Sequence, residues 1–172
     1  MYKAITYTRN KLYDLNILKA TSFKVPIISL GNLSVGGTGK TPHIEYLIRL
    51  LKNKKIYTLS RGYKRKTHGF IIANSQSTSS EIGDEPLQFY KKFKDIKVAV
   101  CEKRTEGVKK ILDKEPDTDI ILLDDAFQHR RITPGLQILI TDFDNLFYHD
   151  YLLPSGRLRE SRSGYKRAQI II

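Results

Sequence analysis

The chain has very few of the residues that characterise secreted and membrane-spanning proteins. Its 172 residues contain one cysteine, Cys101, one methionine and no tryptophan. A single cysteine excludes an intramolecular disulfide framework and fits a reducing compartment, and we interpret Cys101 itself as a structural thiol. No stretch approaches the roughly 20 apolar residues of a membrane-spanning helix, and residues 1–20 lack the apolar core of a secretion signal. We therefore expect a chain that neither crosses a membrane nor is exported through one.

Acidic residues are scarce in the first third of the chain. Residues 1–66 contain 14 Lys and Arg against only Asp14 and Glu45, whereas residues 67–172 contain 16 of each sign, so the net charge of +12 arises from the first 66 residues. A one-sided basic region can bind nucleic acid, an anionic membrane surface or a phosphorylated substrate. A solvated lysine-rich face is a fourth explanation, and charge alone does not choose among them.

The N-terminal segment predicts a basic amphipathic helix over residues 3–19. Four apolar side chains fall near one side of this helix: Ile5, Leu12, Leu15 and Leu18. Four basic residues are interspersed with them: Lys3, Arg9, Lys11 and Lys19. Such a helix can lie in a lipid interface, or its apolar stripe can pack on its own domain. We treat residues 1–22 as a candidate for membrane contact.

Short apolar strands alternate with amphipathic helices along the rest of the chain. Strands are predicted at residues 26–30, 56–60, 69–73, 97–100, 119–123 and 136–141. Helices are predicted at residues 40–53, 84–94 and 103–114, with a polar loop at 74–80. This alternation favours βαβ units and a mainly parallel sheet with helices on both faces. The expected fold is α/β, a three-layer sandwich forming one domain over residues 1–172.

The stretch "SVGGTGKT" joins the predicted strand 26–30 to the predicted helix 40–53. In the pattern GxxxxGK[ST], backbone N–H groups of small residues surround phosphate, the lysine reaches the β- and γ-phosphates, and the hydroxyl binds magnesium. Ser34 replaces the first glycine of the pattern, but Gly36 and Gly37 restore flexibility to the loop. The strand and helix on either side favour a P-loop nucleotide site made of Ser34, Val35, Gly36, Gly37, Thr38, Gly39, Lys40 and Thr41.

Two further segments supply groups that phosphoryl transfer requires. Asp124 and Asp125 follow the apolar strand "DIILL", where a carboxylate can hold the magnesium ion. Gln128 and His129 continue that strand end, so the loop is expected to face the nucleotide. Asp84 in "GDEP" opens a predicted helix, where it can cap the helix or accept a hydroxyl proton during transfer.

Five stretches in this order resemble the tetraacyldisaccharide 4'-kinase family of lipid A biosynthesis: "GNLSVGGTGKTP", "LSRGY", "GDEP", "LDDAFQHRR" and "LLPSGRLRE". The resemblance implies an ATP- and Mg²⁺-dependent kinase that transfers the γ-phosphate to the 4'-hydroxyl of tetraacyldisaccharide 1-phosphate, forming lipid IVA. It also implies an anionic lipid substrate, no nucleic acid partner, and peripheral contact with the cytoplasmic face of the bacterial inner membrane.

The resemblance implies a role for each matching residue. Lys40 and Asp84 correspond to the catalytic lysine and the catalytic base, and Gln128 corresponds to a glutamine near the nucleotide. Thr41, Asp124 and Asp125 correspond to the metal side of the site. The residues expected to face the acceptor or its 1-phosphate are Arg61, Arg157, Arg159 and Glu160.

Two departures from the family pattern bear on activity. Ala126 stands where the family usually has glycine. Family members are also roughly twice as long as this chain, and the chain stops within the strand-like run Ile170–Ile172. We therefore expect that the family's second, smaller domain, with a histidine that assists the catalytic aspartate, is absent. This interpretation predicts weak binding of ATP and magnesium and poor phosphate transfer.

Two alternatives are compatible with a P-loop. A truncated nucleotide-binding remnant would be inactive or weakly active. A nucleic-acid-dependent P-loop ATPase would use the basic first third as its binding surface and bind DNA or RNA in a salt-dependent way. The sequence lacks the compact aromatic and basic array that such a surface typically contains.

Overall fold

A seven-stranded sheet forms the centre of the structure, a computed structural model that describes residues 2–172. Met1, which belongs to the predicted N-terminal segment, lies outside the described residues. The strand order is β3-β4-β2-β5-β1-β6-β7, and neighbouring strands are parallel except for β3 against β4. The strands are β1 Ile27–Asn32, β2 Ile56–Ser60, β3 Ile71–Ile72, β4 Ile96–Val100, β5 Ile120–Asp124, β6 Leu136–Ile140 and β7 Ile170–Ile171. The predicted mainly parallel α/β sheet is confirmed.

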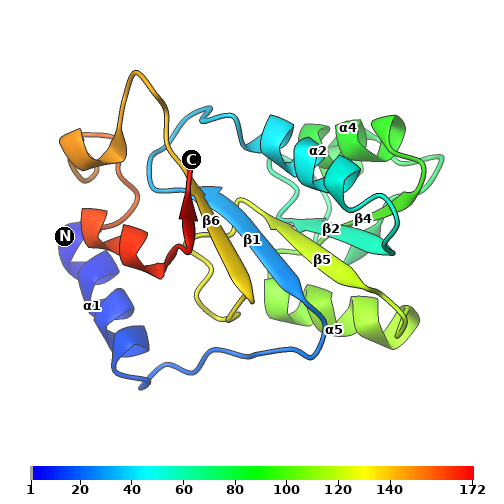
Figure 1. The fold of residues 1–172 in the computed structure, drawn as a ribbon, viewed down its shortest axis with the longest axis horizontal. Helices are drawn as coiled ribbons and strands as arrows, with labels where there is room; N and C mark the ends of the chain where they lie inside the picture. The colour runs from blue at the N-terminus through cyan, green and yellow to red at the C-terminus, as the bar shows by residue number, and fades with distance from the viewer. Residues whose placement is uncertain (1) are drawn as a thin grey trace.

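Helices cover both faces of this sheet, as the three-layer prediction requires (Figure 1). Helices α2 and α4 lie on one face and α5 lies on the other, while α1 stands beside the β6 and β7 end of the sheet. The α-helices are α1 Tyr2–Asp14, α2 Lys40–Leu50, α3 Ser79–Ile82, α4 Asp84–Lys92 and α5 Arg104–Lys114. Two 3₁₀ helices follow β6: η1 Phe147–His149 and η2 Arg162–Arg167.

Two apolar layers, one on each face, hold the helices to the sheet. Ile44 and Ile48 of α2 pack with Phe89 of α4 on one face, and Val108 and Ile111 of α5 pack on the other. All residues of β2 and β5 are buried, as expected for central strands of a parallel sheet covered on both sides. Each fully buried Ile, Leu or Phe side chain stabilises the fold by about 1.5–3 kcal/mol. This rigid centre positions the loops at the carboxyl ends of the strands.

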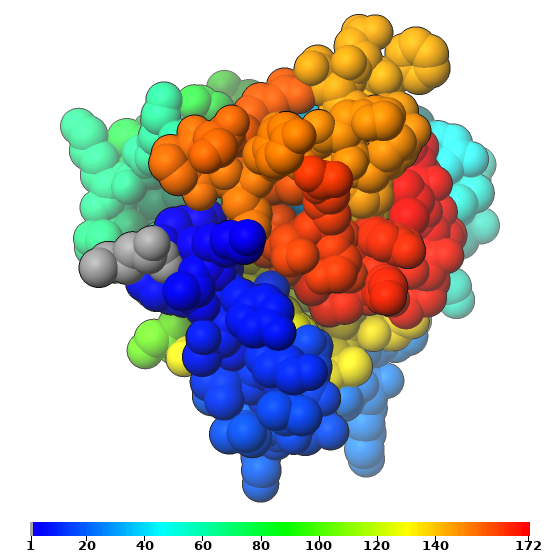
Figure 2. Space-filling model, turned by 90° about the vertical axis from the view of Figure 1, so that its left-hand side faces the viewer, coloured from blue at the N-terminus to red at the C-terminus, as the bar shows by residue number. Residues whose placement is uncertain are grey.

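The N-terminal helix is shorter than predicted. Helix α1 ends at Asp14 instead of residue 19, because Asn16 adopts a left-handed backbone with φ of 56° that stops a helix. The buried side chain of α1 is Tyr13, whereas Ile5 and Leu15 of the predicted stripe are 60% and 57% exposed. Three of the four stripe residues are therefore exposed, and only Leu12 is partly buried against the domain. Figure 2 shows α1, in blue, lying against the orange and red segment that follows β6.

Local signals explain two other differences from the predicted elements. The predicted loop 74–80 contains the start of α3, where Thr78 and Glu81 form a reciprocal capping box. Asp84 is the first residue of α4 and Gly83 is its N-cap, so the capping interpretation of Asp84 is wrong. Within the described residues, no helix combines the length and the apolar character needed to cross a membrane.

Candidate nucleotide site

A cleft of about 920 Å³ opens at the carboxyl ends of β1, β2, β4 and β5. Ligands of open parallel sheets bind at this edge, and the volume lies within the range of small-molecule sites. The loop between β1 and α2 forms one wall and the segment after β5 forms another. Side chains from five other places complete the lining: Arg9, Arg61, Glu85, Arg104 and Arg159.

The P-loop leads into helix α2, and the backbone N–H groups at the start of this helix are free to bind an anion. Gly36 and Gly39 have φ values of 117° and 77°, a conformation that glycine adopts without strain. Gly39 is the N-cap of α2 and makes no side-chain capping bond, so the first turn of the helix remains available to phosphate. The Nζ atom of Lys40 lies 3.4 Å from Asn32 Oδ1 and 3.7 Å from Asp125 Oδ1. The predicted phosphate-binding residues from Gly36 to Thr41 line the cleft.

Ser34 and Val35, predicted as part of the same loop, lie outside the cleft lining. Ser34 is buried and pairs with Leu158 in an isolated β-bridge, and the N–H of Val35 donates to the Arg157 carbonyl at 2.8 Å. These contacts fix the start of the loop to the later segment. A residue with a side chain is therefore accommodated at position 34, where the motif usually has glycine.

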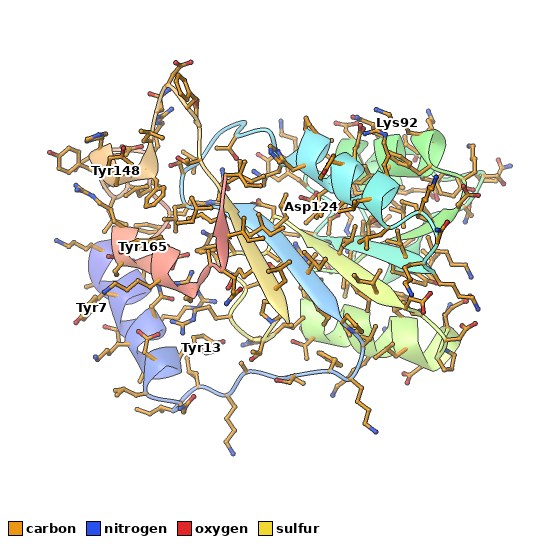
Figure 3. The ribbon with its side chains drawn as sticks, in the orientation of Figure 1. Tyr7, Tyr13, Lys92, Asp124, Tyr148 and Tyr165 are labelled. Carbon is orange, nitrogen blue, oxygen red and sulfur yellow. The ribbon has the colours of Figure 1, made fainter. Side chains whose placement is uncertain are left out.

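Asp124 is the most strongly perturbed carboxylate of the cleft. It lies at the end of β5 nearest α2 (Figure 3) and is only 2% exposed. Burial raises the pKa of Asp124 to about 7, with Glu85 and Asp125 adding to the effect and Lys40 and Arg104 opposing it. Its Oδ1 atom is buried without a hydrogen-bond partner within the described residues.

A divalent cation fits this environment. The cation would supply the missing partner of Asp124 Oδ1 and favour the ionised carboxylate. The hydroxyl of Thr41 lies 3.5 Å from Glu85 Oε1, so a second carboxylate stands beside the threonine that P-loops use for magnesium. The oxygen atoms of Thr41, Asp124 and Glu85 are the donors that could hold Mg²⁺.

Asp125 contacts cationic side chains. Arg159 Nη2 donates to Asp125 Oδ1 at 2.8 Å, and Nη1 donates to Oδ2 at 3.1 Å. Burial raises the pKa of Asp125, but the Arg159 hydrogen bonds and the charges of Arg159, Lys40 and Arg104 outweigh it, so the net pKa is lowered. The role of Asp125 as a metal ligand stays a prediction. Asp125 takes a left-handed φ of 47°, whereas Ala126 is not among the described residues with positive φ, so alanine is accommodated where the family usually has glycine.

Glu160 and Gln128 belong to one hydrogen-bond network. Gln128 lines the cleft, and its Nε2 donates to the Asn32 carbonyl at 2.9 Å and to Glu160 Oε1 at 3.1 Å. Glu160 is 2% exposed and also accepts hydrogen bonds from Asn10 Nδ2 and Arg167 Nη2, both at 2.8 Å. The geometry gives Glu160 a positioning role, because its carboxylate lies behind the cleft wall.

The other predicted substrate and catalytic residues lie in different places. Arg61 is exposed and lines the cleft, whereas Arg157 lies outside the lining and pairs with Asp150 at 3.2 Å. Asp84 is exposed on the first turn of α4 and lines a shallow depression beside Lys91. The acceptor roles of the arginines and the role of Asp84 as base stay predictions.

Several residues of the cleft belong to no motif in the sequence and were not predicted. Arg104 is buried, donates to the Cys101 carbonyl at 2.9 Å, and has a pKa lowered by burial to about 10, which leaves it charged at neutral pH. Its position just after β4 was the available signal, because the carboxyl ends of parallel strands share one edge. Arg9 donates to the Gln128 carbonyl at 2.9 Å across 119 residues, a contact without a local signal.

The fold and the cleft define a P-loop nucleotide-binding protein. A family model described as tetraacyldisaccharide-1-P 4'-kinase matches residues 1–172, and the chain belongs to this family. The predicted resemblance is thereby confirmed.

Relatives and a solved structure agree with this membership. A tetraacyldisaccharide 4'-kinase of Flavobacterium psychrophilum is 58% identical over 100% of the chain and 50% of its own length. One of Bacteroides thetaiotaomicron is 55% identical over 100% of the chain and 46% of its length. The "apo" form of LpxK from Aquifex aeolicus in complex with ATP has a TM-score of 0.91 and 41% identity, over 99% of the chain and 54% of that protein. The chain thus spans about half the length of these relatives.

Proposed function

We propose that the protein transfers the γ-phosphate of ATP to the 4'-hydroxyl of tetraacyldisaccharide 1-phosphate, forming lipid IVA. The observation that carries the proposal is the meeting of Lys40, Thr41, Asp124 and Glu85 in one cleft of a chain from this family. The name of the Aquifex aeolicus relative, a complex with ATP, supports the choice of nucleotide.

The residues of the cleft can stabilise phosphoryl transfer electrostatically. The N–H groups from Gly36 to Thr41 would hold the phosphates, and Lys40 would neutralise charge that develops on the transferred group. Magnesium bound at Thr41 and Asp124 would neutralise the β- and γ-phosphates and align them for attack. Asp125 and Asn32 orient Lys40, since both lie within 3.7 Å of its amine.

The acceptor side of the reaction depends on more exposed residues. We propose that Asp84 accepts the proton of the 4'-hydroxyl and that Arg61, exposed at the cleft, binds anionic groups of the acceptor. Arg159 keeps Asp125 in place and adds positive charge to the same wall. A basic cleft rim suits an anionic lipid better than a neutral sugar.

We further propose peripheral contact with the cytoplasmic face of the bacterial inner membrane through α1. Helix α1 and the turn after it expose six large apolar side chains: Tyr2, Ile5, Tyr7, Leu15, Ile17 and Leu18. Lysine side chains on the same segment would be attracted to anionic lipid. Arg9 of this helix also lines the cleft, so a lipid bound at α1 would lie close to the nucleotide.

A transfer assay with γ-labelled ATP and tetraacyldisaccharide 1-phosphate tests the reaction. We expect labelled lipid that depends on the acceptor and on magnesium and that is lost in Lys40→Ala. ATP binding without labelled lipid would favour the nucleotide-binding remnant. ATP hydrolysis that DNA or RNA stimulates, with no labelled lipid, would overturn the kinase proposal in favour of the nucleic-acid alternative.

A further inference from the structure

A second cavity, of about 290 Å³, lies behind the segment that forms the wall of the nucleotide cleft. Its walls are the end of α1, the linker that follows it, residues 126–134 and the segment after η2. In Figure 1 these are the blue helix and linker, the yellow segment before β6 and the red segment before β7. The floor is the part of β1 and β6 that no helix covers on the α5 face of the sheet.

The floor of this cavity is polar, although it belongs to a buried parallel sheet. Ser29 of β1 and Gln137 of β6 are register partners, so their side chains stand next to each other on the same face. Ser29 is 2% exposed, and its hydroxyl has no hydrogen-bond partner within the described residues. Buried parallel strands normally carry apolar side chains, and burying an unpaired hydroxyl destabilises a fold. The hydroxyl of Ser29 therefore lacks a partner that a ligand in the cavity could supply.

The walls of the cavity carry positive charge. Arg130 and Arg167 line it, and its lining includes no Asp or Glu among the described residues. Each guanidinium pairs with one carboxylate outside the lining, Arg130 with Asp14 and Arg167 with Glu160. Arg167 Nε is nevertheless buried without a partner in the part of the chain that the structure describes. The charged side chains that line the cavity are therefore all cationic, and one of their N–H groups is unpaired.

His129 separates this cavity from the nucleotide cleft. It lines both, and its Nε2 atom is buried without a partner among residues 2–172. Burial and the nearby Arg104, Arg131 and Arg9 lower the pKa of His129 to about 4, so the ring is neutral at physiological pH. These three arginines lie outside the cavity lining, so the charge that faces the cavity comes from Arg130 and Arg167 and favours an anion. A neutral imidazole can donate one further hydrogen bond to such an anion.

We infer that this cavity is a second anion site, which binds a small oxyanion such as phosphate or a short-chain carboxylate. The hydroxyl of Ser29, the amide of Gln137 and the guanidinium of Arg167 would donate to its oxygen atoms. The cavity has less than a third of the cleft volume, so a nucleotide does not fit. The inference does not depend on the kinase proposal, because it concerns other residues and another ligand.

Residue-resolved NMR titration of the 172-residue chain tests the site. Inorganic phosphate and succinate are added separately, and the resonances of Ser29, Gln137 and Arg167, which line the cavity alone, are followed together with those of Gly36 to Thr41. We expect saturable shifts at the cavity with a different midpoint from the P-loop shifts. The relative response to the two anions distinguishes a phosphate site from a carboxylate site.

Variants in the two sites serve as matched controls for each other. Gln137→Leu should weaken anion binding at the cavity at least tenfold and leave the P-loop shifts unchanged. Lys40→Ala should weaken anion binding at the P-loop and leave the shifts at the cavity unchanged. Ser29→Ala, a smaller change, replaces Gln137→Leu if that variant does not give a folded spectrum. Cavity resonances that do not shift at millimolar anion, or that follow the P-loop curve and stop shifting in Lys40→Ala, would overturn the inference.

Discussion

At the scale of single residues, Asp124 and Asp125 show how neighbouring carboxylates acquire opposite properties. Asp124 is enclosed beside Glu85 and lacks a partner for one oxygen, so its ionised form is disfavoured. Asp125 accepts two hydrogen bonds from Arg159, so its ionised form is favoured. The sequence places both at a strand end but does not distinguish them. The difference arises from Arg159, which lies 34 residues further along the chain.

Asp124→Asn should stabilise the metal-free protein and impair the nucleotide site. Each pH unit by which the pKa of a carboxyl group is raised costs about 1.4 kcal/mol of stability when that group is ionised. The asparagine amide carries no charge, so it recovers part of this cost even without a hydrogen-bond partner. We expect thermal unfolding in EDTA to move upward by a few degrees, with loss of magnesium-dependent ATP binding. Asp125→Asn is the matched control and should lower the unfolding temperature, because Arg159 and Lys40 lose their partner.

The stabilisation by Asp124→Asn should depend on pH in a defined way. Because the folded-state pKa is about 7 and the ordinary value is 3.8, the folded form binds the proton more tightly. The contribution of Asp124 to stability therefore falls as pH rises from about 4 to 7. The difference in unfolding temperature between variant and wild type should be small at pH 4 and largest above pH 7. A difference that is constant across this range contradicts the prediction.

His129 should give a pH dependence of the opposite sign. Its pKa is lowered from 6.5 to about 4 by burial and by Arg104, Arg131 and Arg9. Stability from the buried neutral ring is present above pH 6.5 and is lost as pH falls toward 4. We expect His129→Gln to flatten the curve of unfolding temperature against pH between about pH 4 and 6.5. Both proteins in this comparison should carry Asp124→Asn, which removes the titration of Asp124 from the same range.

Some residues of the cleft could be predicted from sequence and others could not. The stretch from Gly36 to Thr41 follows a strand and opens a helix, so local pattern and geometry agree. Glu85 was within reach of such reasoning, because it follows Asp84 in the same first turn. Arg9 reaches the cleft through a contact across 119 residues that a single sequence does not encode locally. Arg159 was predicted only through the family resemblance, and its pairing with Asp125 across 34 residues has no local signal.

At the scale of elements, the predicted bounds of helices and strands agree best with the structure where sequence periodicity and burial coincide. The strand predicted at residues 56–60 has those bounds in the structure, because every one of its residues is buried between two layers. The helix predicted over 3–19 ended early, because a stripe of apolar residues does not reveal the left-handed conformation of Asn16. Helix α3 was missed although "TSSE" contains the capping-box spacing, since its composition resembled a polar loop.

The exposed apolar side chains of α1 and of the turn after it should bind anionic lipid without contributing to the stability of the fold. Ile5→Ser and Leu15→Ser remove exposed apolar side chains, so we expect weaker binding to phosphatidylglycerol vesicles and an unchanged unfolding temperature. Co-flotation with vesicles measures lipid binding, and thermal unfolding measures the stability of the variants. Tyr13→Ser is the control: it removes the buried side chain of the helix and should destabilise the fold. Unchanged flotation of both exposed variants would exclude α1 as the lipid contact.

The segment after η1 should couple α1 to the cleft through Glu160. Glu160→Gln replaces a carboxylate that accepts from Asn10, Gln128 and Arg167, so we expect faster proteolysis near α1 and weaker ATP binding. Arg157→Gln, three residues away, breaks a half-exposed pair with Asp150 and should change stability by less than about 1 kcal/mol. Equal effects of the two variants would argue against a positioning role.

At the scale of the whole molecule, ligand binding should stabilise a fold whose strands converge on one cleft. A ligand that binds the folded state alone adds about 2.7 kcal/mol at 100 times its dissociation constant. We expect ATP with magnesium to raise the unfolding temperature by an amount that grows with the logarithm of ligand concentration above the dissociation constant, and Lys40→Ala to abolish the effect. Stabilisation that persists in Lys40→Ala would place ATP outside the P-loop.

The contacts of α1 also imply an order of assembly. Its hydrogen bonds reach Gln128, Arg130, Arg159 and Glu160, which are 116 to 157 residues further along the chain. Helix α1 therefore finds its place only after the residues that it contacts, 116 to 157 positions further along the chain, have been synthesised. During that interval its apolar side remains accessible to a membrane surface. Pulsed hydrogen exchange during refolding should find the amides of α1 protected after those of β1, β2 and β5.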